Sequence, residues 1–249
     1  MAQAIEMQAR ARGFLLYLCN SNGDPKEEKS LVMSFMERQI RGMIVVPSAG
    51  DLTPFSALRA EGIPYIFLNR TFREDLGHCL REDNEGAAGE IVSYLLQKGR
   101  RHVAGLFLDF ENMIYLERYN GMKKSEEKFG ISWDESLILR NAGNGDFTSR
   151  FRNLFLQENA PDAIFASNDM LAFDAYRVLY ELKERIPEDV MVIGFDDTQM
   201  AKKIYPQLSS YRMPIATIAE SAIQCILEPG KPRQGIIVGE LIKRMSTGD

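Results

Sequence analysis

The sequence lacks the features that mark most enzymes and nucleic-acid-binding domains. It has only two histidines, and it contains no nucleophile elbow, no phosphate-binding Gly-rich loop, no HExxH motif and no CxxC motif. Its 30 Lys and Arg residues are outnumbered by 35 Asp and Glu residues, which gives a net charge of −5. Because binding to phosphates needs clustered Lys and Arg, this balance argues against nucleic-acid binding by these residues themselves.

Cysteines and long apolar runs are scarce as well. Cys19, Cys79 and Cys225 lie far apart, are odd in number and have no metal-ligand spacing, so we expect free thiols in a reducing compartment. No apolar run reaches the roughly 20 residues that a transmembrane helix needs. No signal peptide opens the chain. We therefore expect a cytoplasmic protein with no membrane association and no cofactor.

Short apolar runs alternate with amphipathic stretches along the chain. The clearest unit spans residues 160–197, where two apolar runs at 163–166 and 190–194 flank a stretch with apolar residues at helical spacing. This pattern predicts a strand, a helix and a parallel strand. Further strands are expected at 14–19, 43–46, 65–68, 79–81, 103–108, 137–139, 208–212 and 236–241, with helices at 1–12, 25–39, 54–61, 85–97, 113–129, 147–157 and 215–227. The alternation predicts an α/β fold with parallel sheets.

The first predicted element is a helix at 1–12, which Gly13 ends. Doubly wound sheets normally begin with a strand at or near the sheet centre. We therefore expect that a first strand is missing from this chain. The alternative is that this helix is simply the first element of the fold.

Four residues are candidates for lining a ligand site: Arg118, Phe147, Asn168 and Asp196. Asn168 and Asp196 follow neighbouring predicted strands at their carboxyl ends, where open α/β sheets bind ligands. Arg118 offers a fork of donors, Asn168 offers donors and an acceptor, and an ionised Asp196 only accepts. Phe147 offers an apolar face to a sugar ring or a planar base. Together they fit a small neutral ligand that is rich in hydroxyls or ring nitrogens.

Each of these residues also has a purely structural interpretation. Arg118 could form a surface ion pair, and Phe147 could be the first core residue of its helix. Asn168 could serve only as a helix N-cap, and Asp196 could be a turn former. The chemistry of the side chains does not decide between the two interpretations.

Asp196 and Asp197 together suggest one enzymatic alternative. Two carboxylates at a strand end could hold Mg²⁺, as in receiver-type signalling domains. No acidic pair follows an early strand, however, and no Lys is well placed to complete such a site. We therefore predict no catalytic residue, no metal site and no enzymatic activity.

A series of short motifs carries a family resemblance. In chain order they are Gly62-Ile63-Pro64, Asp83-Asn84-Glu85-Gly86, Arg118-Tyr119-Asn120-Gly121, Asn168-Asp169, Pro187-Glu188-Asp189-Val190, Gly194-Phe195-Asp196-Asp197 and Lys243-Arg244-Met245-Ser246-Thr247. Each motif is weak alone, but their order is specific. Over residues 1–249 the sequence resembles the effector domain of LacI/GalR-family bacterial transcription regulators.

The resemblance implies a periplasmic-binding-protein-like type I fold of two Rossmann-like lobes. Parallel sheets flanked by helices would form each lobe, and three crossovers would join them. We place the crossovers near 109–112, 213–214 and 238–241. The N-terminal lobe would then comprise 1–109 and 214–238, and the C-terminal lobe 110–213 and 239–249.

The resemblance also implies a function. A small-molecule effector, a sugar or a nucleoside-like compound, would bind between the lobes. Residues matching Arg118, Asn168 and Asp196 would hydrogen-bond it, and the residue matching Phe147 would stack on it. Relatives form homodimers and bind operator DNA through an N-terminal helix-turn-helix, which is missing here. Met213 stands where several relatives carry a Gln, which indicates a less polar or different ligand. The alternative function is that of a solute-binding protein of a sugar transporter.

Overall fold

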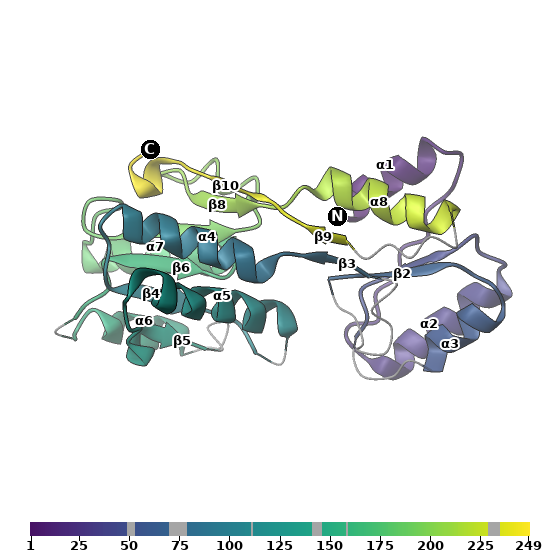
Figure 1. The fold of residues 1–249 in the computed structure, drawn as a ribbon, viewed down its shortest axis with the longest axis horizontal. Coiled ribbons are helices and arrows are strands. Elements are labelled where there is room, and N and C mark those ends of the chain that lie inside the picture. Colours follow the sequence, from purple (N-terminus) through teal and green to yellow (C-terminus); the bar gives the residue numbers. More distant parts are fainter. Residues whose placement is uncertain (49–52, 70–78, 111, 141–145, 158, 229–234) are drawn as a thin grey trace. The chain divides into compact units, whose positions relative to one another are not determined.

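The structure is a computed structural model that describes residues 1–48, 53–69, 79–110, 112–140, 146–157, 159–228 and 235–249. The chain folds into two compact units (Figure 1). Unit 1 comprises Met1–Glu82 and Pro214–Ile237, and unit 2 comprises Asp83–Met213 and Val238–Asp249. The chain therefore passes between the units three times, as expected. No helix in the described ranges is long and apolar enough to cross a membrane.

Unit 1 is built on a parallel four-stranded sheet. The strand order is β1 (Met43–Val45), β2 (Tyr65–Leu68), β3 (Cys79–Glu82) and β9 (Gly235–Ile237). Helices α1 (Ala2–Arg10) and α8 (Ile215–Leu227) pack together on one face, and α2 (Pro25–Glu37) and α3 (Thr53–Ala60) cover the other (Figure 1). Phe55 of α3 packs edge-to-face on Phe67 of β2 with ring centroids 4.9 Å apart, and both side chains are fully buried.

The predicted strand at 14–19 is wrong. This segment forms no ladder with any strand of the described residues, and Leu15 and Leu18 are 79% and 73% exposed. An apolar run becomes a buried strand only where a neighbouring strand satisfies its backbone groups. The helix predicted at 1–12 is confirmed. It is α1, which ends before Gly13, a residue with a φ of +79°.

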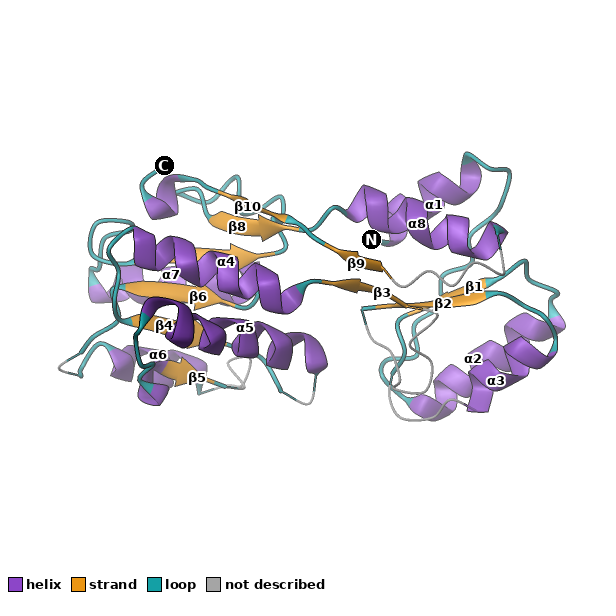
Figure 2. Cartoon of the chain, in the orientation of Figure 1, coloured by secondary structure: helices purple, strands orange, loops and turns teal. Residues whose placement is uncertain are grey.

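Unit 2 contains a six-stranded sheet, seen with its flanking helices in Figure 2. The order is β10 (Glu240–Ile242), β8 (Ser209–Arg212), β7 (Met191–Phe195), β6 (Ala163–Ala166), β4 (Val103–Leu106) and β5 (Ile138–Leu139). All neighbours are parallel except β10, which is antiparallel to β8. Helix α4 (Asn84–Gln97) packs along α5 (Met113–Phe129), and α6 (Phe147–Leu154) packs beside α7 (Asp169–Leu182).

The core of unit 2 follows from the alternation of side chains along its strands. Ile164, Ala166 and Val192 join the cluster that α6 and α7 build on one face of the sheet. Phe165 and Ile193, at the intervening positions, face the opposite side. They are as fully buried as the first set, so both faces are covered. This explains why β6 and β7 read as continuous apolar runs.

The structure corrects the predicted boundary between the lobes. Residues 83–109 belong to unit 2 and not to the first unit, because α4 packs on α5 and β4 pairs with β6 and β5. The predicted single strand at 236–241 is two strands, β9 in unit 1 and β10 in unit 2. They separate at Val238 and Gly239. A Cβ on Gly239 would lie 2.2 Å from the Arg212 carbonyl oxygen, so only glycine fits at this crossing.

Candidate functional site

Polar residues collect at the carboxyl ends of β6 and β7. Ser167 and Asn168 follow β6, and Asp196 and Asp197 follow β7. Because the two strands are parallel neighbours, with Phe165 opposite Ile193, these ends meet at one edge of the sheet. This is the edge at which open α/β sheets bind ligands. The predicted strand–helix–strand unit thus places two of the four candidate residues together.

Asn168 is the N-cap of α7. Its Oδ1 accepts a hydrogen bond from the Leu171 N–H at 2.8 Å, and its backbone is extended with a φ of −155°. Asn168 therefore does cap the helix, as its structural interpretation predicts, and this role leaves part of its side chain available. The cap uses the carbonyl oxygen of the side chain, and the amide nitrogen is the other hydrogen-bonding group that Asn168 can offer a ligand.

The turn after β7 has an unusual backbone. Asp196 has a φ of +107° and Asp197 a φ of +46°, so two consecutive residues with side chains lie in the region that favours glycine. Each such residue costs about 1–3 kcal/mol, and strain of this kind clusters at ligand-binding and catalytic sites. Asp196 is exposed while Phe195 before it is fully buried. The turn therefore exposes Asp196 to solvent at the carboxyl end of β7.

Arg118 is buried behind this edge, with 4% exposure. Its Nε donates to Asn84 Oδ1 at 2.9 Å, and its Nη1 donates to the Ser167 carbonyl oxygen at 2.5 Å. Its guanidinium carbon lies 3.4 Å from the centroid of the Phe195 ring. Arg118 is therefore not a surface ion-pair residue. It joins the start of α4 to the ends of β6 and β7, directly beside Asn168 and Asp196.

Phe147 is a core residue. It is 5% exposed and stacks on Phe151 with ring centroids 5.6 Å apart and an interplanar angle of 9°. It belongs to the apolar cluster on the α6 and α7 face of unit 2. The structure thus brings Arg118, Asn168 and Asp196 to one edge and places Phe147 in the packing below it.

Other buried polar residues near this edge were not among the four candidates from the sequence. Asn84 is 2% exposed and donates through Nδ2 to Glu117 Oε2 at 3.1 Å, in addition to accepting from Arg118. Asp169 and Ser210 are fully buried and hydrogen-bond each other at 2.6 Å. Burial raises the pKa of Asp169 most, and the Asp197 charge adds to this rise against the lowering by its hydrogen bonds. One signal in the sequence could have indicated such residues, namely a polar residue inside a predicted buried strand, such as Ser210 in the strand at 208–212.

Asp197 does not offer a metal site. Its side chain is 2% exposed, and its two oxygens accept from Arg212 Nε at 2.6 Å and from Arg244 Nη2. Lys202 Nζ lies 3.9 Å away. Three cations around one carboxylate would repel a bound Mg²⁺. Within the described ranges, no group of three His, Cys, Asp or Glu residues is placed to hold a metal ion.

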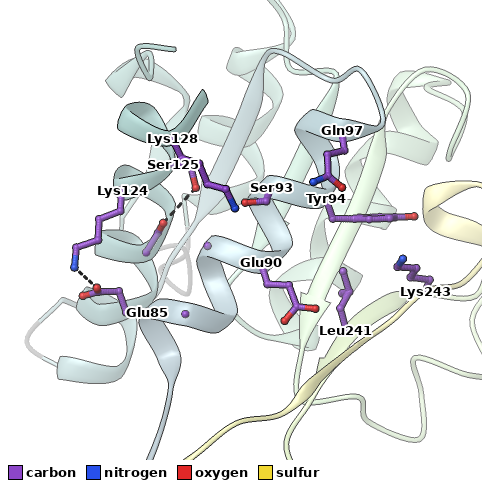
Figure 3. A pocket seen from close by; sticks show the side chains of 13 residues that line it. Glu85, Glu90, Ser93, Tyr94, Gln97, Lys124, Ser125, Lys128, Leu241 and Lys243 are labelled. Atoms are coloured by element: carbon purple, nitrogen blue, oxygen red, sulfur yellow. Dashed lines mark hydrogen bonds and ion pairs between the residues drawn. The ribbon is translucent and has the colours of Figure 1, made fainter. Parts of the chain in front are cut away.

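A separate open groove of about 560 Å³ runs along α4 between α5 and β10 (Figure 3). Lys124 pairs with Glu85 at one end, and Lys243 lies 4.7 Å from the Tyr94 ring centroid. None of the four candidate residues lines it. It is therefore treated as separate from the site at the sheet edge, and its Lys and Glu side chains leave it little net charge.

This architecture matches a known family. A model of the periplasmic binding protein-like domain matches residues 92–247. The chain belongs to this family. The similarity of fold extends beyond the matched residues, because solved structures cover 98% of this chain.

Among curated proteins, the HTH-type transcriptional regulator DegA of Bacillus subtilis (strain 168) is 27% identical over 218 residues, which are 86% of this chain and 65% of DegA. The chain thus spans about two thirds of the length of this relative. Among solved structures, the Escherichia coli transcriptional repressor ascG is 24% identical with a TM-score of 0.85, covering 98% of this chain and 92% of that one. A LacI family regulator from Enterococcus faecium with bound ribose is 23% identical, with a TM-score of 0.83 and coverages of 98% and 91%.

Proposed function

We propose that this chain is the effector-binding and dimerisation part of a bacterial LacI-type transcriptional regulator. Its family membership supports the fold-level part of this proposal. The named relatives are transcriptional regulators and repressors, which favours a regulator over the solute-binding protein of a transporter. It also favours a non-enzymatic role. A regulator of this kind acts in the cytoplasm, where its operator DNA lies.

The ligand is a small polar molecule, a sugar or a nucleoside-like compound, bound at the carboxyl edge of β6 and β7. The observation that carries this assignment is the strained turn that exposes Asp196 beside Asn168 and the buried Arg118. A carboxylate and an amide at a sheet edge suit a ligand with several hydroxyls. Solved relatives bind ribose and cellobiose, so sugars are the first class to test.

Regulation would proceed by a population shift. A ligand that binds one arrangement of the protein about a hundredfold more tightly than another supplies about 2.7 kcal/mol of bias. Operator binding would require a helix-turn-helix segment outside these 249 residues, in keeping with the HTH-type description of DegA. The full regulator would bind DNA as a homodimer.

A thermal-shift screen tests the ligand assignment. The panel would contain D-ribose, D-xylulose, cellobiose, adenosine and inorganic phosphate. At one hundred times its dissociation constant, a ligand adds about 2.7 kcal/mol, which for a protein of this size raises the Tm by about 5–10 °C. Asp196→Asn should abolish the shift. Glu188→Gln is the matched control, because Glu188 is exposed and lies before β7, at the end opposite Asp196.

A shift that is equal in the wild type and in Asp196→Asn would remove Asp196 from the site. A shift lost in both variants would indicate a general effect of charge. No shift with any compound of the panel would count against a sugar or nucleoside ligand.

A further inference from the structure

Three consecutive backbone amides in the turn after β7 donate to three different acceptors. The Asp196 N–H donates to the Tyr211 carbonyl oxygen at 2.9 Å. The Asp197 N–H donates to Ser210 Oγ at 2.9 Å, and the Thr198 N–H donates to Asp169 Oδ2 at 2.7 Å. The backbone of the turn is therefore fixed by β8 and by the first residue of α7.

Asp169 and Ser210 form the buried part of this hydrogen-bond network. The Ser210 hydroxyl donates to Asp169 Oδ1 at 2.6 Å and accepts from the Asp197 N–H, so it links the carboxylate to the turn. Both side chains are fully buried, which protects these bonds from competition by water. The arrangement also explains Gly194, where a Cβ would lie 2.3 Å from Asp169 Oδ1.

Asp197 secures the other side of the turn. Its carboxylate accepts from Arg212 at the end of β8 and from Arg244 after β10. Arg212 also donates through Nη1 to Glu240 Oε1 at 3.1 Å. Charge-assisted bonds to a side chain with 2% exposure are stronger than neutral ones. A backbone with two consecutive positive φ values persists only where its surroundings determine it in this way.

We propose that Asp169, Ser210 and Asp197 are positioning residues that set the affinity of the site without touching the ligand. They hold the turn in the one conformation that presents the Asp196 carboxylate. This inference rests on the proposed function for its effect on ligand affinity. The positioning itself is a property of the turn that can be measured without a ligand.

Neighbouring serines of β8 provide a matched pair of variants. Ser210→Ala removes the link between Asp169 and the turn. Ser209→Ala removes an equally buried hydroxyl whose bonds go to the backbone of Arg244 (2.8 and 3.1 Å) and to the Thr247 hydroxyl (2.8 Å). These partners are not atoms of the turn, and Ser209 is linked to it indirectly, through the Arg244 side chain that donates to Asp197. Ser210→Ala removes two hydrogen bonds and Ser209→Ala removes three, so a general loss of stability would be at least as large in Ser209→Ala.

Amide hydrogen exchange is the first readout. In Ser210→Ala the amides of Asp196 and Thr198 keep their own acceptors, so faster exchange there reports loosening of the whole turn. We expect at least a tenfold acceleration in Ser210→Ala and none in Ser209→Ala. Ser210→Thr, which retains the hydroxyl, should restore slow exchange. Arg212→Gln is a second, partly exposed variant that should accelerate the same amides if Ser210→Ala does not fold.

Isothermal titration with D-ribose is the second readout. We expect the dissociation constant to rise about tenfold in Ser210→Ala, equivalent to about 1.4 kcal/mol, and to stay unchanged in Ser209→Ala. Equal exchange at Asp196 and Thr198 in both serine variants would overturn the positioning role. If D-ribose does not bind the wild type while exchange changes as expected, the pentose assignment fails and the positioning role of the three residues stands.

Discussion

Replacing Arg118 with Met tests whether the hydrogen bonds and ring contact of this residue stabilise the sheet edge. The substitution keeps a long unbranched side chain but removes the donors to Asn84 Oδ1 and to the Ser167 carbonyl oxygen. Each buried acceptor left without its donor costs about 1–3 kcal/mol. The lost stacking on Phe195 costs about 2 kcal/mol more when the pair is desolvated.

Part of this cost is recovered, because the variant no longer has to bury a charge. We expect a net loss of about 2–4 kcal/mol in the stability of unit 2, which is a decrease in Tm of about 4–16 °C. Thermal unfolding followed by circular dichroism measures it. Arg177→Met is the matched control, since this arginine of α7 has a side chain that is 55% exposed and pairs with Glu181 at 3.9 Å. Such a surface pair contributes about 0–1 kcal/mol.

If Arg118→Met and Arg177→Met lower the Tm equally, Arg118 does not stabilise the sheet edge. Its role there would then be confined to ligand binding. The same proteins then separate the two roles. A loss of D-ribose binding in Arg118→Met without a loss of stability would assign Arg118 to the ligand.

Two further predictions concern packing and pH. Gly121→Ala should lower the free energy of unfolding by about 1–3 kcal/mol, because its Cβ would lie 2.1 Å from the Glu85 carbonyl oxygen. Gly89→Ala is the control and should change stability little, because the atom nearest to its Cβ would be 3.6 Å away. Urea titration of both variants measures the difference. Burial, with the charges of Glu90 and Asp83, raises the pKa of Tyr211 to about 12 from 10.0. The unfolded chain then releases this proton first, so stability falls as the pH rises from 10 to 12. Tyr211→Phe should flatten that fall in alkaline unfolding curves, and an unchanged slope would contradict the assignment.

The candidate site was partly accessible from the sequence. Asn168 and Asp196 follow strands whose apolar runs are local signals, and the N-cap Asn168 marks the start of α7. The residues that support them were not accessible. Asp169, Ser210 and Arg118 act through partners that are 41, 41 and 49 positions away in the chain, and no local pattern encodes such pairings.

The sequence by itself determined the elements whose signals are local. Helical spacing, capping residues and buried apolar runs define α7, β6 and β7, and their alternation defines the α/β class. Only the tertiary structure decided which of these elements belong together. An apolar run at 14–19 forms no strand without a neighbour to pair with, and residues 83–109 join unit 2 because α4 packs on α5.

The same distinction governs the side chains. An Arg, a Phe or an Asp carries its chemistry in any context, but its burial depends on which elements pack around it. Packing placed Phe147 in the core and Arg118 under Phe195. It also tied the turn at Asp196 to α7 and β8. These contacts join residues far apart in the chain, so their free energy exists only once the fold has brought the elements together.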